Sequence, residues 1–296
     1  MQTRKRRARG GIRTVAFLGL GLMGRLMAAN LRRAGFALRG YDPKGGGNCR
    51  SAREAASGAQ VLITMVPDGN AALRAVRSAL PGLAPDSIVV DMSSSDPADT
   101  RRLNVLLKRQ GIHLLDAPVS GAKAKAADGT LAIMVGGDAR VLRRVRPVLA
   151  ALGDQIFHAG GLGAGHAAKA LNNYLGAAGT IAGFEALLVG HRFGLDPRVL
   201  IGIINASTGR NSTTERKIPQ QVFTRKFNSG FRMALMTKDV AIARRIARQL
   251  GMRTPYLDKT LRIWAQALAR MGEAADHTEL YRHLQRHQRR RRLPRG

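Results

Sequence analysis

Three glycines near the start of the chain have the spacing that lets a backbone approach a pyrophosphate. Gly19, Gly21 and Gly24 of GLGLMG form a G-x-G-x-x-G pattern directly after the apolar run TVAFL and before an amphipathic stretch. The first glycine allows a tight turn, the second lets phosphates come close, and the third lets helix and strand pack together. The helix N-terminus adds amide donors and partial positive charge. The pattern therefore predicts a dinucleotide-binding turn, which also includes Leu20, Leu22 and Met23.

An acidic residue follows at the distance where a protein contacts the adenosine ribose of a dinucleotide. Asp42 comes after the next apolar run, FALRGY, roughly 20 residues beyond the glycines. A carboxylate there accepts hydrogen bonds from the ribose hydroxyls and repels a 2′-phosphate, which favours NAD over NADP. Arg39 and Lys44 leave NADP open. The alternative is that Asp42 only begins the turn Asp-Pro-Lys-Gly, as Asp often does.

The elements that must position these residues alternate along the first half of the chain. The runs TVAFLGLG, FALRGYD, VLITMVP, SIVVDMSS, HLLDAPV and TLAIMVGG are strand-sized, and helical stretches separate them. Strands separated by helices predict a parallel sheet with right-handed crossovers. We therefore expect an α/β fold with a Rossmann-type doubly wound parallel sheet, forming a dinucleotide-binding domain over residues 14–162.

The strand signals stop after residue 162, and the sequence becomes helical segments punctuated by Gly and Pro. This pattern predicts an all-helical C-terminal domain over residues 163–285, with a role in substrate binding and oligomerisation. One helix from about His166 to Phe193 would be roughly 40 Å long and could link the two domains.

Charge and cysteine content limit the classes to which this protein can belong. The 296-residue chain has a formal net charge of +30 and one cysteine. Residues 1–13 and 286–296 are basic and show no helical or strand period, which predicts disordered tails. A host organism whose proteins are generally basic would explain the charge. The alternative is salt-sensitive binding to polyanions. Without a partner for Cys49 or an apolar run long enough to span a membrane, we expect a cytoplasmic protein.

Five separated motifs carry a resemblance to a known family. They are GLGLMG, DMSSSDP at 91–97, DAPVSGA at 116–122, GAGHAAKALNN at 163–173 and LMTKD at 235–239. In this order they resemble the β-hydroxyacid dehydrogenases, which include 3-hydroxyisobutyrate, tartronate semialdehyde and threonate dehydrogenases, with 6-phosphogluconate dehydrogenase as a larger relative. The resemblance spans residues 14 to about 284. It implies an NAD(P)-dependent oxidoreductase that transfers a hydride between a small 3-hydroxy acid and the nicotinamide.

The resemblance also implies the catalytic residues. Lys169, the lysine of G-x-G-x-x-x-K, would take the hydroxyl proton during oxidation and return it during reduction. An ammonium is a poor base unless burial or neighbouring positive charge lowers its pKa. Asn173 lies one helical turn further on the same face and would orient the substrate hydroxyl. The alternatives are a solvated lysine on a helix face and an asparagine satisfied among the helices.

Ser120 and Gly121 follow the run HLLDAPV, at the carboxyl end of the expected sheet, where ligands of open α/β folds bind. A hydroxyl and exposed amides there suit a substrate carboxylate, and the alternative is a simple turn serine. Many members of the family have a glycine where this chain has Ala122. If that position requires a positive φ, the alanine is strained.

Further contacts are expected in both halves. Arg210 and Phe231 lie in segments that resemble the substrate-specificity region of the family. The resemblance implies that Lys238 lies near the nicotinamide ribose, and the alternative is a helix-start lysine beside an N-capping Thr237. The other cofactor contacts follow predicted strands and are Met65, Val66, Pro67, Ser93 and Ser94. The histidines and the single cysteine show no metal-ligand spacing, so no metal is expected.

The chain departs from the family pattern after Asp42, where roughly ten residues are missing before VLITMVP. A Gly45–Gly47 linker would replace a helix and could shorten the sheet. The shortened connection and Ala122 support one alternative, a cofactor-binding homologue that is defective in catalysis. The basic tails support another, a nucleic-acid-binding scaffold. The helical half would expose an apolar face as a monomer, so we expect a homodimer or homotetramer. Small substrates such as 3-hydroxyisobutyrate, tartronate semialdehyde or threonate are expected, and the polar GRN segment favours a polyhydroxylated acid.

Overall fold

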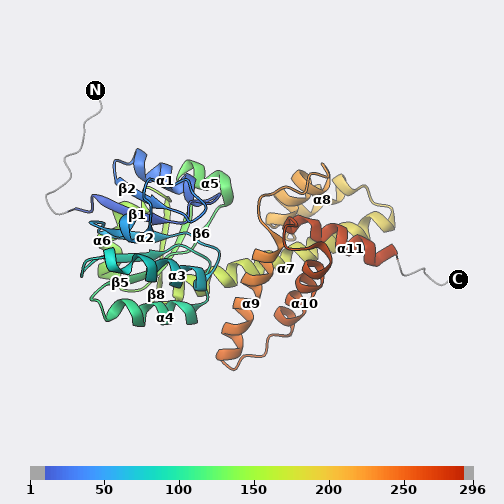
Figure 1. Cartoon of the computed structure of the whole chain (residues 1–296). Coiled ribbons are helices and arrows are strands. Elements are labelled where there is room, and N and C mark those ends of the chain that lie inside the picture. Colours follow the sequence, from blue (N-terminus) through green and yellow to red (C-terminus); the bar gives the residue numbers. More distant parts are fainter. Residues whose placement is uncertain (1–10, 290–296) are drawn as a thin grey trace. The chain divides into compact units, whose positions relative to one another are not determined.

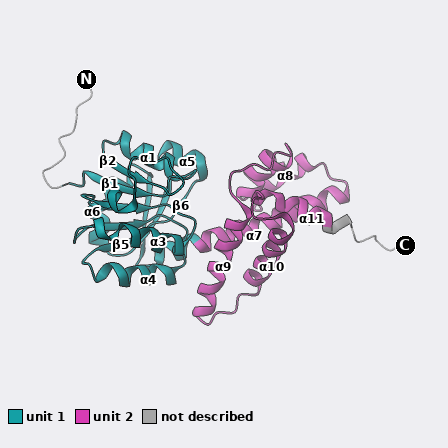
Figure 2. Cartoon of the chain, viewed as in Figure 1, with its two compact units in different colours: residues 1–169 teal, residues 170–296 magenta. Residues whose placement is uncertain are grey.

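The computed structural model describes residues 11–289, with side chains up to residue 286. The chain divides into two compact units, residues 1–169 and 170–296, coloured separately in Figure 2. The division falls inside the helix α7 (Ala164–Phe193), whose 30 residues run without interruption (Figure 1). The long helix predicted from about His166 to Phe193 is therefore confirmed.

Unit 1 is built on an eight-stranded sheet with the order β2-β1-β3-β4-β5-β7-β6, and β8 pairs with β7. The strands are β1 (Thr14–Leu18), β2 (Ala37–Tyr41), β3 (Val61–Thr64), β4 (Ile88–Asp91), β5 (His113–Asp116), β6 (Val119–Ser120), β7 (Ala132–Gly136) and β8 (Gln155–Gly160). The six predicted strands are present. The structure adds β6, which is too short for a pattern, and β8, which is largely exposed.

Strands β2, β1, β3, β4 and β5 are mutually parallel, as the alternation with helices predicted. Strand β7 instead pairs antiparallel with β5 and β6, and parallel with β8. The expectation of a wholly parallel sheet is therefore wrong beyond β5. The physical reason is that a short apolar run has the same pattern in a buried strand of either direction, so the sequence does not reveal its orientation.

Helices cover both faces of this sheet, because alternate residues of each strand point to opposite sides. Val15 and Phe17 pack with α1 and α6 in one apolar core, and Ala16 and Leu18 pack with α2, α3 and α4 in another. The bounds are α1 (Gly24–Arg33), α2 (Ala52–Ala56), α3 (Gly69–Ala79), η1 (Leu80–Gly82), α4 (Pro97–Lys108), α5 (Ala122–Asp128) and α6 (Ala139–Leu149). The predicted doubly wound architecture is confirmed.

The short connection after Asp42 contains one five-residue helix, α2, and no strand. The linker glycines Gly45 and Gly46 have φ of +94° and +88°. Asn48 then returns to the exposed edge of β2, where its side chain accepts from Gly40 N at 2.6 Å and donates to Leu38 O at 3.0 Å. The amide of Asn48 therefore satisfies the edge strand that the shortened connection leaves without a neighbour.

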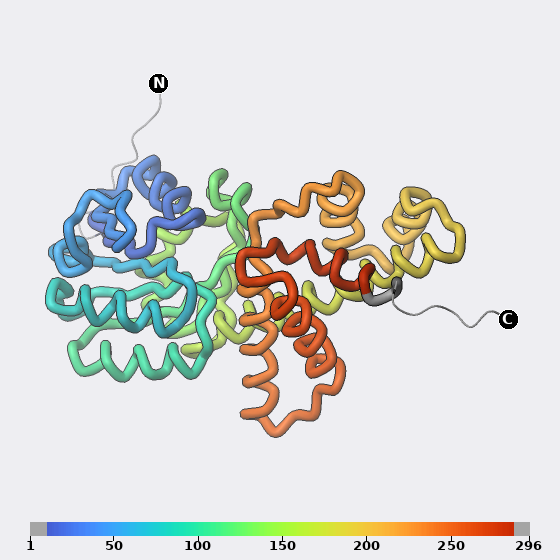
Figure 3. Tube along the Cα trace, turned by 45° about the vertical axis from the view of Figure 1, so that its right-hand side comes forward, coloured from blue at the N-terminus to red at the C-terminus, as the bar shows by residue number. Residues whose placement is uncertain are grey.

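The described part of unit 2 consists of helices and their connections. Beyond α7 these are α8 (Pro197–Asn205), η2 (Thr213–Val222), α9 (Met233–Gln249), α10 (Pro255–Met271), η3 (His277–Glu279) and α11 (Leu280–Arg289). Helices α9 and α10 lie side by side as an antiparallel pair (Figures 1 and 3). They share an apolar core with α7, which includes the fully buried Phe184 of α7 and Trp264 of α10. The helical second half is therefore confirmed for the residues that the structure describes.

The two predicted basic tails fall mostly outside the described residues, which exclude 1–10 and 290–296. At their inner ends the structure corrects the prediction of disorder. Helix α11 continues through residue 289, so the segment 286–289 is helical. Arg13 N donates to Gln60 Oε1 at 2.7 Å, which ties residue 13 to the start of the sheet.

Candidate active site

The glycine turn has the close backbone approach that its sequence predicted. Gly19 has φ +96° and donates from its N–H to Tyr41 O at 3.1 Å. A Cβ on Gly19 would collide with Met65 O, and one on Gly24 would collide with Gly19 O. A Cβ on Gly21 would meet nothing within 4 Å. The turn is thus closed toward the sheet and open at Gly21, which is the side on which a pyrophosphate can approach the backbone.

Asp42 contacts the glycine turn and also begins the turn that follows β2. Its Oδ2 accepts from Leu20 N in the glycine turn at 2.7 Å, and its Oδ1 accepts from Lys44 N at 2.8 Å, which begins the following turn. Arg39 is directed away, because its guanidinium donates to Glu54 O at 2.7 Å at the end of α2. The carboxylate beside the turn and the engaged arginine fit the ribose hydroxyls of NAD better than a 2′-phosphate.

The carboxyl ends of β1, β2, β3, β4 and β5 meet at one edge of the sheet, because Leu18, Tyr41, Thr64, Asp91 and Asp116 are in register. The last three form a buried polar row, each exposed by 1% or less. The glycine turn and the predicted contact residues that follow these strands therefore lie at the same edge of the sheet. In an open α/β sheet this edge is where ligands bind.

Asp91 organises the loop that contains the predicted serine contacts. Its Oδ1 accepts from Thr64 Oγ1 at 2.8 Å and from Ser93 N at 3.0 Å, and its Oδ2 accepts from Ser95 Oγ at 2.9 Å. Ser93 is fully buried, and its Oγ accepts from Val66 N at 3.1 Å. Ser93 therefore supports the backbone at Val66, whereas Ser94, Met65 and Val66 are half-buried and Pro67 is exposed.

Asp116 fastens the start of α7 to this edge. Its Oδ1 accepts from Gly163 N at 2.7 Å and its Oδ2 accepts from His166 N at 2.8 Å, so one buried carboxylate satisfies two N–H groups of the first helical turn. The glycine spacing of the motif has a steric reason here, because a Cβ on Gly165 would collide with Met134 O. Sequence reasoning missed this role of Asp116, although the residue opens the DAPVSGA motif.

His166 fills the space between the two buried carboxylates. Its Nδ1 lies 2.7 Å from Thr100 Oγ1 and its Nε2 lies 3.1 Å from Ser93 O. The ring nitrogens are 3.7 Å from Asp91 Oδ2 and 3.9 Å from Asp116 Oδ2. Lys169 follows three residues later on α7 and is half-buried. Helix α7, which carries Lys169, is therefore anchored to the same loops that contain predicted cofactor contacts.

The predicted substrate loop contains a strained residue. Ser120 ends β6, and Gly121 has φ +143°. Ala122 has φ +56°, in the left-handed region that costs a residue with a Cβ roughly 1–2 kcal/mol. Ala122 therefore has the positive φ at which an alanine is strained.

Asn173, on the part of α7 that belongs to unit 2, is oriented by a carboxylate. Its Nδ2 donates to Asp239 Oδ2 at 2.6 Å, and its Oδ1 accepts from Asn172 Nδ2 at 3.2 Å. Asp239 is 2% exposed, and its Oδ1 lies 3.2 Å from Lys238 Nζ. Because a carboxylate can only accept from the amide, the NH₂ group of Asn173 must face Asp239. Asp239 was missed, although LMTKD contains it.

The structure also decides the alternative role given to Lys238. Helix α9 begins at Met233, and Thr237 lies in its interior, where its hydroxyl donates to Met233 O at 3.0 Å. Thr237 is not an N-cap, so the helix-start explanation of Lys238 is wrong.

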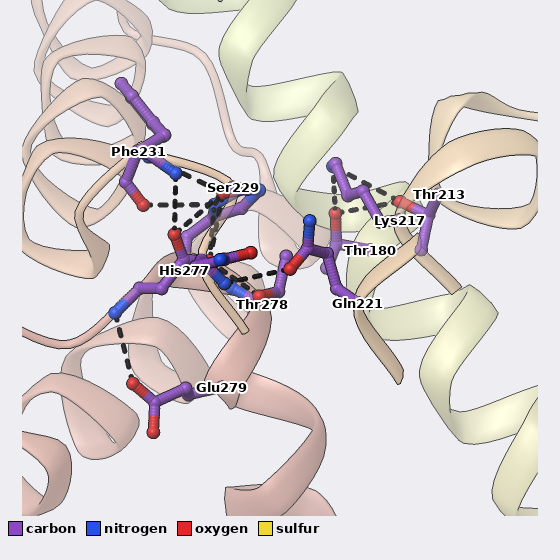
Figure 4. Close-up of polar contacts among 12 residues, drawn as sticks. Thr180, Thr213, Lys217, Gln221, Ser229, Phe231, His277, Thr278 and Glu279 are labelled. Atoms are coloured by element: carbon purple, nitrogen blue, oxygen red, sulfur yellow. Dashed lines mark hydrogen bonds and ion pairs between the residues drawn. The ribbon is translucent and has the colours of Figure 1, made fainter. Parts of the chain in front are cut away.

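The two residues predicted to contact the substrate tail lie in different surroundings. Arg210 is exposed, and its Nε is 3.7 Å from Glu215 Oε1. Phe231 is half-buried and packs edge-on against His277, with ring centroids 5.5 Å apart. Phe231 thus belongs to a cluster of polar contacts around His277 and Ser229 (Figure 4).

No group of three or more His, Cys, Asp or Glu side chains among the described residues could hold a metal ion. No helix within residues 11–289 is long and apolar enough to cross a membrane.

The glycine turn, its acidic neighbour and the strand edge define the class: an oxidoreductase that uses a nicotinamide dinucleotide. Residues 14–161 match the family described as NAD binding domain of 6-phosphogluconate dehydrogenase. Residues 163–284 match the family described as NAD-binding of NADP-dependent 3-hydroxyisobutyrate dehydrogenase. Both matches agree with NAD as the cofactor and with NADP as a second option.

Similar proteins extend these matches over most of the chain. A probable 3-hydroxyisobutyrate dehydrogenase of Mycobacterium tuberculosis is 38% identical over 283 residues, covering 90% of this chain and 94% of the relative. An NAD-dependent L-serine dehydrogenase of Pseudomonas aeruginosa is 36% identical, covering 89% and 94%. The solved structure of M. tuberculosis 3-hydroxyisobutyrate dehydrogenase with L-serine has a TM-score of 0.84 at 36% identity, covering 92% and 99%. The chain belongs to the β-hydroxyacid dehydrogenase family and is an NAD(P)-dependent dehydrogenase acting on CH–OH groups.

Proposed function

We propose that this dehydrogenase oxidises a small 3-hydroxy acid, with Lys169 as the acid/base. The observation that carries the proposal is the attachment of α7 to the sheet through Asp116, which accepts from Gly163 N and His166 N. This attachment gives Lys169, less than one turn beyond His166, a defined place relative to the loops of the cofactor edge. A rigidly supported acid/base group close to the hydride acceptor is what alcohol oxidation requires.

The bound nicotinamide supplies the hydride acceptor, and the remaining chemistry belongs to the protein. Lys169 Nζ, when neutral, takes the hydroxyl proton of the substrate. Asn173 has given one N–H to Asp239, so its second N–H is the one that can donate to the substrate oxygen. Ser120 and the amides at Gly121 would hold the substrate carboxylate. In this scheme Asp239 acts through Asn173 and is a positioning residue.

NADH formation on a panel of small hydroxy acids at alkaline pH tests the proposal. The panel includes 3-hydroxyisobutyrate, L-serine, glycerate and threonate. Lys169→Ala should lower kcat/KM for any substrate by about a hundredfold or more, the lower end expected for a general base. Lys259→Ala, at an exposed lysine of α10, serves as the matched control and should change it little. A Lys169→Ala enzyme that keeps a tenth of the wild-type activity contradicts the assignment.

A second candidate function rests on Ala122, whose φ of +56° strains the predicted substrate loop. A homologue that binds NAD but does not turn over would explain the tolerance of this strain. It would show NAD binding by fluorescence quenching without NADH formation on any acid of the panel. The nucleic-acid hypothesis gains no support, since residues 1–10 and 290–296 lie outside the described structure.

We also propose that unit 2 mediates homodimer or homotetramer formation. Several large apolar side chains on α7 and α8 are exposed, among them Leu175 at 69%, Val189 at 66% and Phe193 at 82%. Contiguous exposed apolar surface marks association sites. Light scattering after size-exclusion chromatography should show an oligomer that Val189→Glu with Phe193→Glu converts to smaller species. A monomeric wild type at micromolar concentration contradicts the proposal.

A further inference from the structure

His166 is a buried histidine to which the proposed reaction gives no role. It is 1% exposed and lies in the first turn of α7, three residues before Lys169. Its Nε2 lies 3.1 Å from Ser93 O, and its Nδ1 lies 2.7 Å from Thr100 Oγ1 on α4. Because a carbonyl oxygen can only accept, Nε2 carries a proton and donates it to Ser93 O. The ring of His166 thus joins the helix that carries Lys169 to two other parts of unit 1.

The segment that His166 contacts contains predicted cofactor contacts. Residues 92–96, which we call the serine loop, follow β4 at the carboxyl edge of the sheet. Ser93 is fully buried, and its Oγ accepts from Val66 N at 3.1 Å, so the serine loop also supports the loop after β3. Ser94 is partly exposed. Ser94 can therefore face a nicotinamide while the carbonyl of Ser93 is held by His166.

Two buried carboxylates fix the partners of this contact separately. Asp91, at the end of β4, accepts from Ser93 N at 3.0 Å and holds the serine loop. Asp116, at the end of β5, accepts from His166 N at 2.8 Å and holds the start of α7. The bond from His166 Nε2 to Ser93 O then links the two segments directly. Moving the serine loop about 1 Å away from α7 would take this bond out of the hydrogen-bond range, unless the helix moved with it.

We propose that His166 couples the serine loop to α7, so that binding of the nicotinamide against the loop also fixes the position of Lys169. This inference rests on the proposed function, because it needs cofactor contact at the loop and Lys169 as the acid/base. His166 is a positioning residue, since it acts through Ser93 and α7 and not through contact with the reacting atoms. Displacing a reacting group by about 1 Å can cost about a hundredfold in rate, so loss of the coupling slows the chemical step.

A matched pair of substitutions isolates the hydrogen bond. His166→Gln places an amide donor about as far from the backbone as Nε2, so it can still donate to Ser93 O. His166→Met has about the same length and fills the same space, but it has no donor. His166→Asn is the third variant, for use if the methionine does not fold between the two carboxylates. It keeps a polar amide, but it is one methylene too short to reach Ser93 O.

Hydrogen exchange with mass spectrometry tests the coupling without turnover. Saturating NADH should slow exchange in peptides covering residues 160–170 of the wild type and of His166→Gln, and it should not do so in His166→Met or His166→Asn. His113→Met is the control, because His113 lies at the opposite end of β5 and contacts Asp86 there. It should keep the protection. Protection that persists without the donor, or a wild type that shows none, overturns the proposal.

Kinetics on any acid of the panel that is oxidised test the positioning role. His166→Met should lower kcat per NADH-binding site by at least about tenfold, with the substrate KM and the Kd of NADH nearly unchanged. His166→Gln should restore kcat. A purely structural role would lower the number of binding sites and leave kcat per site unchanged, and this result overturns the assignment. If exchange shows the coupling while no acid is oxidised, the coupling stands and the proposed reaction fails.

Discussion

Replacing Asp116 should weaken unit 1 more than any exposed helix cap would. The Asp116 carboxylate is fully buried and accepts from Gly163 N at 2.7 Å and His166 N at 2.8 Å. Asp116→Ala leaves both donors buried without a partner, and each such donor costs about 1–3 kcal/mol. We expect the free energy of unfolding to fall by about 4 kcal/mol. Asp116→Asn keeps one acceptor oxygen and should cost about half as much.

Asp138 provides the matched control in the same unit. It also accepts two backbone N–H groups, from Arg140 and Val141 at the start of α6, but it is exposed. Water can replace its carboxylate, so Asp138→Ala should cost only about 1 kcal/mol. The comparison therefore isolates the contribution of burial from that of capping.

Urea unfolding followed by far-UV circular dichroism measures these differences. Hydrogen exchange with mass spectrometry adds a local test, since Asp116→Ala should accelerate exchange in peptides covering residues 160–170. The reasoning is refuted if Asp116→Ala and Asp138→Ala lower the free energy of unfolding equally, or if exchange in that peptide does not change.

Two further predictions concern strain and pH. Ala122→Gly removes a side chain from a residue at φ +56° and should raise the free energy of unfolding by roughly 0.5–1 kcal/mol in urea titrations; a decrease contradicts the strain. Burial, with the charge of Lys217, lowers the pKa of His277 to about 4. The unfolded chain then binds the proton more tightly, so stability is lost as pH falls from about 6.5 to 4, by on the order of 3 kcal/mol. Fluorescence of Trp264, which stacks on His277, follows this loss, and His277→Asn should flatten the pH dependence; an unchanged slope contradicts the assignment.

The parts of the site that the sequence predicted are those built by neighbours in the chain. The turn at Gly19 and Gly24 and the carboxylate of Asp42 belong to one strand-turn-helix-strand unit, whose local geometry requires those residue types. Likewise the parallel strands β1 to β5 and the long α7 follow from hydrophobic periodicity. Each of these features depends on residues that are close in sequence, so motif spacing and hydrophobic periodicity can predict it.

Tertiary structure alone decided which polar groups meet across long separations. Asp116 reaches His166 N over 50 residues, Asn173 reaches Asp239 over 66, and Lys217 reaches Thr180 over 37. The direction of β7 and the positive φ of Ala122 also depend on packing against distant segments. The chain by itself thus determined a nicotinamide-binding α/β fold with a lysine on a long helix. Its tertiary structure decided which buried polar groups anchor the helix that carries that lysine, because buried hydrogen bonds are satisfied by whichever groups the fold brings together.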